Sequence, residues 1–185
     1  MSRVRITGGE WRSRLVKVID APGLRPTPDR VRETLFNWLG QDLTGWCCLD
    51  LFAGSGILGF EAASRGAEKV VFVERDQRSV QVLRQNAATL VPETAVGGRL
   101  EVHPGDGVKF AASVAAAGPA FDLVFLDPPY RLGLLERTWP HLAALCRPGA
   151  RLYVEAGQAV EPPLPWRVVR AGVAGQVHFH LLEST

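Results

Sequence analysis

A short turn in the sequence, Asp127-Pro128-Pro129-Tyr130, could hold an amine close to an electrophile. Its two prolines remove two backbone N–H donors and fix two φ angles, which leaves a rigid turn rich in hydrogen-bond acceptors. The Asp127 carboxylate and the Pro128 carbonyl could both accept from one exocyclic NH2 group, and Tyr130 could stack on the ring that carries it. Two fixed acceptors would orient the weakly nucleophilic lone pair of such an amine. We therefore predict that these four residues are catalytic and that a base must leave its stack to reach them. A turn without chemistry is the alternative.

A second stretch, residues 47–65, predicts a nucleotide-binding crossover. Its first six residues form an apolar run interrupted only by Asp50, as in a strand buried on both faces of a parallel sheet. Gly54, Gly56 and Gly59 follow with the spacing G-x-G-x-x-G, before a run of helix-forming residues. Such glycines let the backbone approach a ligand closely, and the helix N-terminus presents free N–H groups. The same spacing could bind a dinucleotide, S-adenosylmethionine or nothing, so it does not identify the ligand.

Acidic residues stand at the ends of successive expected strands, where open α/β sheets bind their ligands. Glu74 lies about twenty residues after the first glycine, where an acid can accept from ribose hydroxyls. Asp106 could accept from an adenine amino group. Asp50 is costly to bury unpaired, so it would orient the loop or meet a cationic amino group. The alternatives are solvated acids at Glu74 and Asp106 and a loop brace at Asp50. The predicted cofactor-binding residues are Asp50, Phe52, Ala53, Gly54, Gly56, Glu74, Arg75, Asp106 and Gly107.

The elements that must position these residues alternate between strand and helix. Strands are expected over 47–52, 69–74, 99–103, 121–127 and 151–155, and helices over 76–90, over 107–117 and from the proline turn through Cys146. Two further β runs, 166–170 and 176–182, leave no room for a crossover helix and should pair antiparallel. The prediction is a doubly wound, Rossmann-like α/β fold with a mostly parallel seven-stranded sheet and an antiparallel C-terminal hairpin. This is the pattern of class I methyltransferases. His178 and His180 share one face of the last strand and are interpreted as packing residues.

The N-terminal segment concentrates positive charge. Residues 1–32 carry eight basic and three acidic side chains, whereas the whole chain has a net charge of only +2. Basic and apolar residues alternate around Gly8-Gly9, which predicts a β-hairpin with a two-glycine turn and an exposed face of arginines that includes Trp11. We expect residues 1–20 to form a hairpin extension and residues 21–185 a single methyltransferase domain. A basic face suits a polyanion, and the alternative is ordinary solvated charge. The hairpin residues predicted to bind RNA are Arg3, Arg5, Arg12 and Arg14; Arg25 and Arg30 are added to the predicted RNA-binding residues by the family resemblance given below.

A proline-rich connector over 20–28 leads into an amphipathic helix that should end near Gly40. Thr27 is the expected N-cap and Pro28 the first helical residue. Arg30 and Arg32 occupy the first turn, where the helix dipole disfavours cations, so a nearby anion is expected and Arg30 is a candidate to contact it.

Length and composition fit one globular domain. The chain has 185 residues, 46% of them hydrophobic, with no apolar run long enough for a bilayer and no secretory signal. Its three cysteines lack metal-ligand spacing, so we expect no metal site. We expect the cysteines to be reduced thiols in a cytoplasmic protein. We expect a monomer.

Longer motifs carry a resemblance to a known family. R-I-T-G-G-E-W-R, R-P-T-P-D-R-V-R-E-T-L-F-N-W-L, L-D-L-F-A-G-S-G-I-L-G-F-E-A, L-D-P-P-Y and A-G-Q-V are similar to motifs of the bacterial RsmD family, over about residues 3–182. These enzymes methylate a guanine N2 in 16S ribosomal RNA of small-subunit particles, with S-adenosylmethionine as donor. The resemblance implies that Asp50, Gly54, Gly56, Glu74 and Asp106 hold the donor and that Asp127, Pro128 and Tyr130 hold the guanine amine. It also implies that the hairpin and residues 25–32 contact RNA or the methionine end of the donor.

Other functions stay open at this point. The proline turn recognises an amine rather than a particular base, so adenine N6 in DNA or RNA is an alternative substrate. A non-catalytic RNA-binding assembly factor is a second alternative, and a nicotinamide-dependent oxidoreductase leaves the proline turn and the C-terminal hairpin unexplained.

Overall fold

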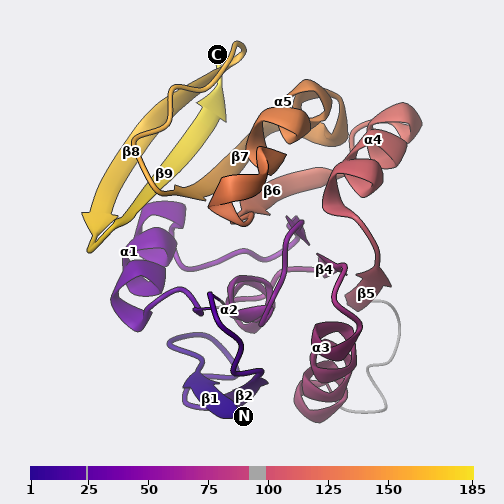
Figure 1. Ribbon diagram of the computed structural model, residues 1–185, viewed down its shortest axis with the longest axis vertical. Coiled ribbons are helices and arrows are strands. Elements are labelled where there is room, and N and C mark those ends of the chain that lie inside the picture. Colours follow the sequence, from indigo (N-terminus) through magenta and orange to yellow (C-terminus); the bar gives the residue numbers. More distant parts are fainter. Residues whose placement is uncertain (24, 92–98) are drawn as a thin grey trace.

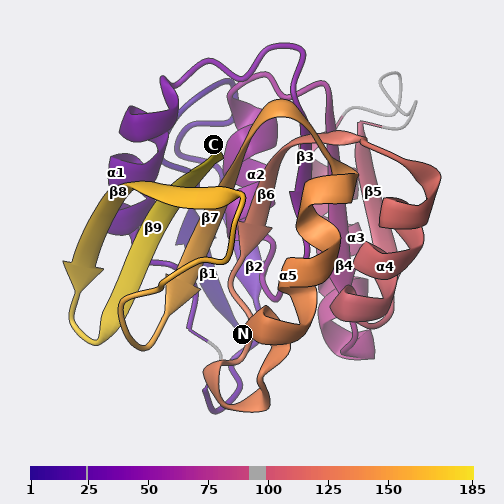
Figure 2. The ribbon, with the colours of Figure 1, turned by 90° about the horizontal axis from the view of Figure 1, so that it is seen from above.

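A seven-stranded sheet forms the middle layer of the protein (Figures 1 and 2). The computed structural model describes residues 1–23, 25–91 and 99–185. The strand order is β5-β4-β3-β6-β7-β9-β8; β3 to β7 run parallel, and β9 is antiparallel to both of its neighbours. The strands are β3 (Cys47–Asp50), β4 (Lys69–Glu74), β5 (Leu100–Pro104), β6 (Phe121–Leu126), β7 (Cys146–Ala156), β8 (Trp166–Ala174) and β9 (Val177–Ser184). The predicted doubly wound fold with an antiparallel C-terminal hairpin is confirmed.

Helices cover both faces of the sheet. The helices α1 (Asp29–Leu39), α2 (Ile57–Ser64) and α3 (Gln77–Leu90) share one apolar core with the sheet, which includes Phe125 and Tyr153. The helices α4 (Gly107–Ala117) and α5 (Leu134–Leu145) share the other, which includes Val124 and Leu152. Figure 2 shows α4 and α5 together on one side of the sheet. None of the helices within the described ranges is long and apolar enough to cross a membrane.

The strand order reverses between β3 and β6, which are neighbours although β4 and β5 lie between them in the chain. Crossovers from β3 lead to one edge of the sheet, and those from β6 lead to the other. In such sheets a crevice forms beyond the carboxyl ends of the strands at this reversal. The glycine loop after β3 and the proline turn after β6 are therefore brought to the same place.

The glycine loop has its glycines for reasons of backbone geometry. Gly56, directly before α2, has a φ of 74°, and a Cβ there would lie 2.3 Å from Cδ2 of Leu83 in α3. Any larger residue would combine an unfavourable φ with a clash against α3. Gly56 thus allows α2 to turn sharply away from β3 and pack close to its neighbours.

The N-terminal hairpin exists, but its predicted two-glycine turn is wrong. β1 (Ser2–Arg5) pairs with β2 (Leu15–Val18), so the connection runs over residues 6–14. The glycines face α2 instead: a Cβ on Gly9 would lie 2.1 Å from the Ser64 carbonyl oxygen. Trp11, expected on the exposed face, is only 3% exposed and donates its backbone N–H to Ser64 Oγ at 2.9 Å. Close packing against α2, rather than a tight turn, explains why the connection between β1 and β2 contains Gly8 and Gly9.

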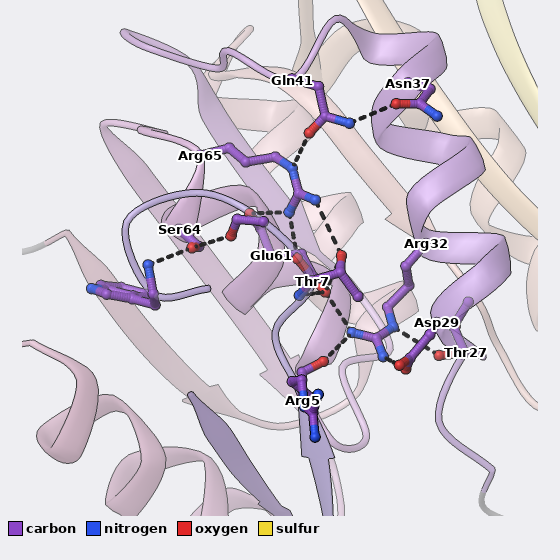
Figure 3. A network of polar contacts seen from close by, with 12 residues as sticks. Arg5, Thr7, Thr27, Asp29, Arg32, Asn37, Gln41, Glu61, Ser64 and Arg65 are labelled. Atoms are coloured by element: carbon purple, nitrogen blue, oxygen red, sulfur yellow. Dashed lines mark hydrogen bonds and ion pairs between the residues drawn. The ribbon is translucent and has the colours of Figure 1, made fainter. Parts of the chain in front are cut away.

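A buried ionic network ties this hairpin to α1 and α2 (Figure 3). Glu61 in α2 forms ion pairs with both Arg32 and Arg65, and all three side chains are buried. The Thr7 backbone N–H donates to Glu61 Oε1 at 2.8 Å, and Arg32 Nη1 donates to the Arg5 carbonyl at 2.8 Å. Arg32 is therefore neutralised inside the protein, which removes its conflict with the dipole of α1.

The start of α1 also differs from the prediction. The helix begins at Asp29 after Pro28, and it ends at Gly40 as expected. The expected N-cap, Thr27, does not cap it, because its hydroxyl donates to Glu155 Oε1 at 2.6 Å. The Thr27 hydroxyl is thus bonded to Glu155 in β7 and not to the N-terminus of α1.

Two strand boundaries in the C-terminal part were also misplaced. The fifth strand was expected over 151–155, but β7 already begins at Cys146 and contains Pro148 and Gly149, where the register with β6 shifts. The turn between β8 and β9 is Gly175-Gln176, shorter than predicted. The packing interpretation of His180 is confirmed: it is buried, and its Nε2 accepts from the Val160 N–H at 3.2 Å.

Candidate active site

A crevice of two adjoining pockets lies beyond the carboxyl ends of β3 to β6. The first is lined by Arg25, Pro26, Thr27, Asp50, Phe52, Ala53, Gly54, Ser55, Ile57, Leu58 and Asp127. The second is lined by Leu51, Phe52, Val73, Glu74, Arg75, Gly105, Asp106, Gly107, Pro129, Leu132 and Leu134. Phe52 belongs to both. Of the predicted cofactor-binding residues, all but Gly56 line this crevice; Gly56 lies behind it, against α3.

The acids at the ends of β4 and β5 are held by backbone N–H groups. Glu74 accepts from the Gly54 N–H at 2.8 Å and from the Asp76 N–H at 2.7 Å, so its carboxylate fixes the glycine loop to the next strand. Asp106 accepts from the Lys109 N–H at 2.9 Å and caps α4. Both side chains have fixed orientations at the rim of the second pocket. Their remaining lone pairs are available to hydroxyl or amino donors of a ligand.

Asp50 is a buried acid in the first pocket. Its Oδ2 accepts from the Gly59 N–H at 3.1 Å, which links β3 to α2. Burial raises the pKa of Asp50 to about 8, and the nearby carboxylates of Glu74 and Glu155 act in the same direction. A cationic group placed in this pocket would favour the ionised form and be attracted by it.

The proline turn stands between the crevice and a separate cavity. Asp127 follows β6 and lines the first pocket, whereas Pro128, Pro129 and Tyr130 line a cavity of about 370 Å³, which we call the turn cavity. Tyr130 is 49% exposed. Burial of its carboxyl group raises the pKa of Asp127 well above the usual value, and the carboxylates of Glu155 and Asp50 raise it further. The four predicted catalytic residues thus lie together, with the acid on the crevice side.

Glu155 is a site residue that the sequence reasoning missed. It is 4% exposed, lines the turn cavity, and accepts from Thr27 Oγ1 at 2.6 Å and from the Tyr153 hydroxyl at 2.9 Å. A signal was present, because Glu155 ends a predicted strand just as Glu74 does. It was read only as a strand boundary.

The predicted RNA-binding arginines are all on the surface, with two qualifications. Arg3, Arg5, Arg12 and Arg30 are exposed. The Arg14 guanidinium donates to the carbonyl oxygens of Thr89, at 2.7 Å, and Leu90, at 3.4 Å, so it is tied to the end of α3. Arg25 lines the first pocket of the crevice, beside Asp50 and Asp127. These two side chains therefore have neighbours that the sequence did not indicate.

The sheet order, the antiparallel C-terminal hairpin and the crevice at the strand reversal define the class I methyltransferase fold. The sequence model of the family described as "Conserved hypothetical protein 95" matches residues 4–183. The chain belongs to this family, the RsmD family that its motifs resemble.

Individual relatives agree over the full length. "Ribosomal RNA small subunit methyltransferase D" of Escherichia coli strain K12 is 44% identical over 188 residues, covering 98% of this chain and 90% of the relative. The protein of the same name from Haemophilus influenzae is 39% identical, covering 98% of this chain and 94% of the relative. The solved structure of the Escherichia coli protein yhhF superposes with a TM-score of 0.85 at 42% identity, covering 99% of this chain and 98% of that one.

Proposed function

We propose that this chain transfers a methyl group from S-adenosylmethionine to the exocyclic N2 amine of a guanine in 16S ribosomal RNA, within the small subunit or an assembly intermediate. The observation that carries the proposal is the position of the Asp127–Tyr130 turn between the crevice and the turn cavity. A donor in the crevice and a base in the cavity would meet at this turn. The names of the full-length relatives support ribosomal RNA as the substrate class.

The residues that line the crevice support the donor as its ligand. Two pockets joined at Phe52 suit a ligand with two parts, and the rim acids Glu74 and Asp106 suit ribose and adenine donors. In the first pocket, Asp50 would meet the ammonium of the methionine end and Arg25 its carboxylate. Both residues line that pocket, so the opposite charges of this end have partners there. S-adenosylmethionine, when bound, supplies an electrophilic methyl group next to a positively charged sulfur.

The turn would hold the amine. Asp127 and the Pro128 carbonyl accept its two N–H groups, so that its lone pair points at the methyl carbon, and Tyr130 stacks on the base. With the donor bound, the nitrogen lone pair would attack the methyl carbon, the C–S electron pair would leave with the sulfur, which would become neutral, and the amine would lose one proton. Asp127 is placed to take that proton, because burial makes its carboxylate more basic than an exposed one.

The RNA would approach over the basic N-terminal part. Arg3, Arg5 and Arg12 are exposed on or beside the hairpin, and Arg30 lies on the exposed side of α1. In Figure 2 the N-terminus and the segment between β6 and α5 both lie toward the lower end of the molecule. Arginines contacting phosphates would give affinity that falls steeply with salt.

The test is transfer of labelled methyl from S-adenosylmethionine to unmodified small ribosomal subunits, followed by digestion of the RNA to nucleosides. We expect label in N2-methylguanosine with the parent and none with Asp127→Ala. Label in N6-methyladenosine would overturn the proposed base. Absence of both label and donor binding would overturn the methyltransferase proposal in favour of an RNA-binding assembly factor.

A further inference from the structure

The turn cavity has a carboxylate in its wall. Glu155 Oε1 accepts from the hydroxyls of Thr27 and Tyr153, which fixes the side chain. Within the described part of the chain, no hydrogen bond reaches Oε2, and this atom is not among the fully enclosed polar atoms without a partner. Because Glu155 lines the cavity, Oε2 is the acceptor it offers to an occupant.

Glu155 also lies directly beside the residue that would hold the amine. Leu126, the last residue of β6, is in register with Val154 of β7, and Asp127 and Glu155 are the residues that follow this pair along the chain. Neighbouring strands are about 4.8 Å apart, and residues in register point to the same face. The two carboxylates are therefore expected to lie close together, and the charge of Glu155 contributes to the raised pKa of Asp127.

This arrangement distinguishes between amino bases. In guanine the atom next to the N2 amine on the Watson–Crick edge is N1, which carries a hydrogen and donates. In adenine and in cytosine the ring nitrogen next to the amine is an acceptor without a hydrogen. A carboxylate beside the amine-binding group therefore attracts guanine and repels the lone pair of the other two.

We propose that Glu155 accepts a hydrogen bond from N1–H of the target guanine while the proline turn holds its N2 amine, so that Glu155 selects guanine over other amino bases. The inference rests on the proposed function, since it assigns the base that enters the same site. Thr27 and Tyr153 act as positioning residues, because their hydroxyls occupy Oε1 and leave Oε2 to the base.

The test compares two target nucleotides in otherwise identical RNA. Once the labelled guanosine has been located by nuclease mapping, subunits are reconstituted with either guanosine or 2-aminopurine at that position. 2-Aminopurine keeps the 2-amino group but has an acceptor at N1. We expect the parent to prefer guanosine in kcat/KM by at least about 100-fold, as sites built around a substrate hydrogen bond do.

Glu155→Gln supplies the discriminating measurement. Its amide can donate to N1 of 2-aminopurine, so we expect the preference to fall by tenfold or more. The missing O6 of 2-aminopurine affects parent and variant alike, so the change in the ratio reports on residue 155. Glu136→Gln is the matched control, because Glu136 is an exposed carboxylate at the same cavity, and its ratio should match that of the parent.

An unchanged ratio in folded Glu155→Gln, even with lower rates on both substrates, would show that Glu155 only braces Thr27 and would overturn the inference. Folding is checked by thermal unfolding and by donor binding. If Glu155→Gln does not fold, Glu155→Asp replaces it, since the shorter carboxylate withdraws from the base and should also lower the ratio. Failure of the parent to label any guanosine would instead defeat the proposed function itself.

Discussion

The carboxyl group of Asp127, directly after β6, lies close enough to that of Glu155 in β7 for its pKa to be raised by the Glu155 charge. Their charges disfavour each other, and burial raises the pKa of both. Glu155 has two hydroxyl donors that favour its ionised form, whereas no described residue donates to Asp127. The two hydroxyls thus oppose the rise in the pKa of Glu155, and no described donor opposes it at Asp127. A cationic donor and an amine would both favour the ionised form of Asp127.

Replacement of Asp127 by alanine should separate catalysis from donor binding. We expect the single-turnover rate of methyl transfer to fall by at least about 100-fold, because both the orientation of the amine and the acceptor for its proton are lost. Binding of S-adenosylmethionine, measured by calorimetry, should change little, since most of the crevice is untouched. Equal transfer rates in the variant and the parent would contradict the role assigned to Asp127.

Asp50→Asn should change how stability depends on pH. The pKa of Asp50 is raised from 3.8 to about 8, so between these values the folded protein keeps a proton that the unfolded chain has lost. Asp50 thus stabilises the fold least at high pH, and its contribution falls by at most about 1.4 kcal/mol per pH unit. The asparagine variant retains an acceptor for Gly59 but does not titrate.

The measurement is urea unfolding of parent and variant from pH 4 to pH 9. The stability of Asp50→Asn relative to the parent should rise from about pH 4 to about pH 8 and then level off. Taking the difference removes the contributions of groups that behave alike in both proteins. A difference that is constant across this range would show that Asp50 is ionised in the folded protein at all of these pH values.

Much of the sheet could be predicted because its strands are apolar runs. The buried strands β4 and β6 were placed within one residue, since a parallel strand covered on both faces has few polar positions to confuse its limits. The ends of β7 and β8 were less certain, because these strands lie toward an edge and include exposed residues. Pro148-Gly149 indicates a turn in the sequence, yet a bulge accommodates both residues within β7.

The parts of the site that depend on neighbouring residues in the sequence could be predicted. The contacts between residues distant in the sequence could not. The glycine loop and the proline turn were recognised because each is local. Thr27 looked like a helix cap, but Glu155 competes for its hydroxyl from the other end of the chain. Gly9 looked like a turn residue because its contact with Ser64 is likewise invisible in sequence.

The network around Glu61 should be essential for attachment of the hairpin. Glu61→Gln leaves Arg32 and Arg65 buried with only part of their compensation, and breaking buried ion pairs costs roughly 3–5 kcal/mol. We expect a loss of this order in urea unfolding, with faster proteolysis of residues 1–20. Glu68→Gln, at an exposed position, is the control. A loss of unfolding free energy below about 1 kcal/mol would show that the ion pairs of Glu61 contribute as little as exposed pairs do.

Arg12 and Arg14 should behave differently, although both were predicted to bind RNA. Arg12 is exposed, so Arg12→Ala should reduce the dependence of log affinity on log salt by about 0.7 to 1, as expected for one lost phosphate contact. The Arg14 guanidinium is already bound to the carbonyls of Thr89 and Leu90, where it offsets the dipole of α3. Arg14→Ala should therefore lower the free energy of unfolding by about 1 kcal/mol and change the salt slope less.

Filter binding of small-subunit RNA at several salt concentrations measures the salt slope of the affinity. Urea unfolding measures the free energy of unfolding. Arg84→Ala is the matched control, because it removes an exposed arginine from α3 outside the hairpin. If Arg12→Ala gives the same slope as Arg84→Ala and the parent, Arg12 does not contact RNA, and its predicted role is overturned.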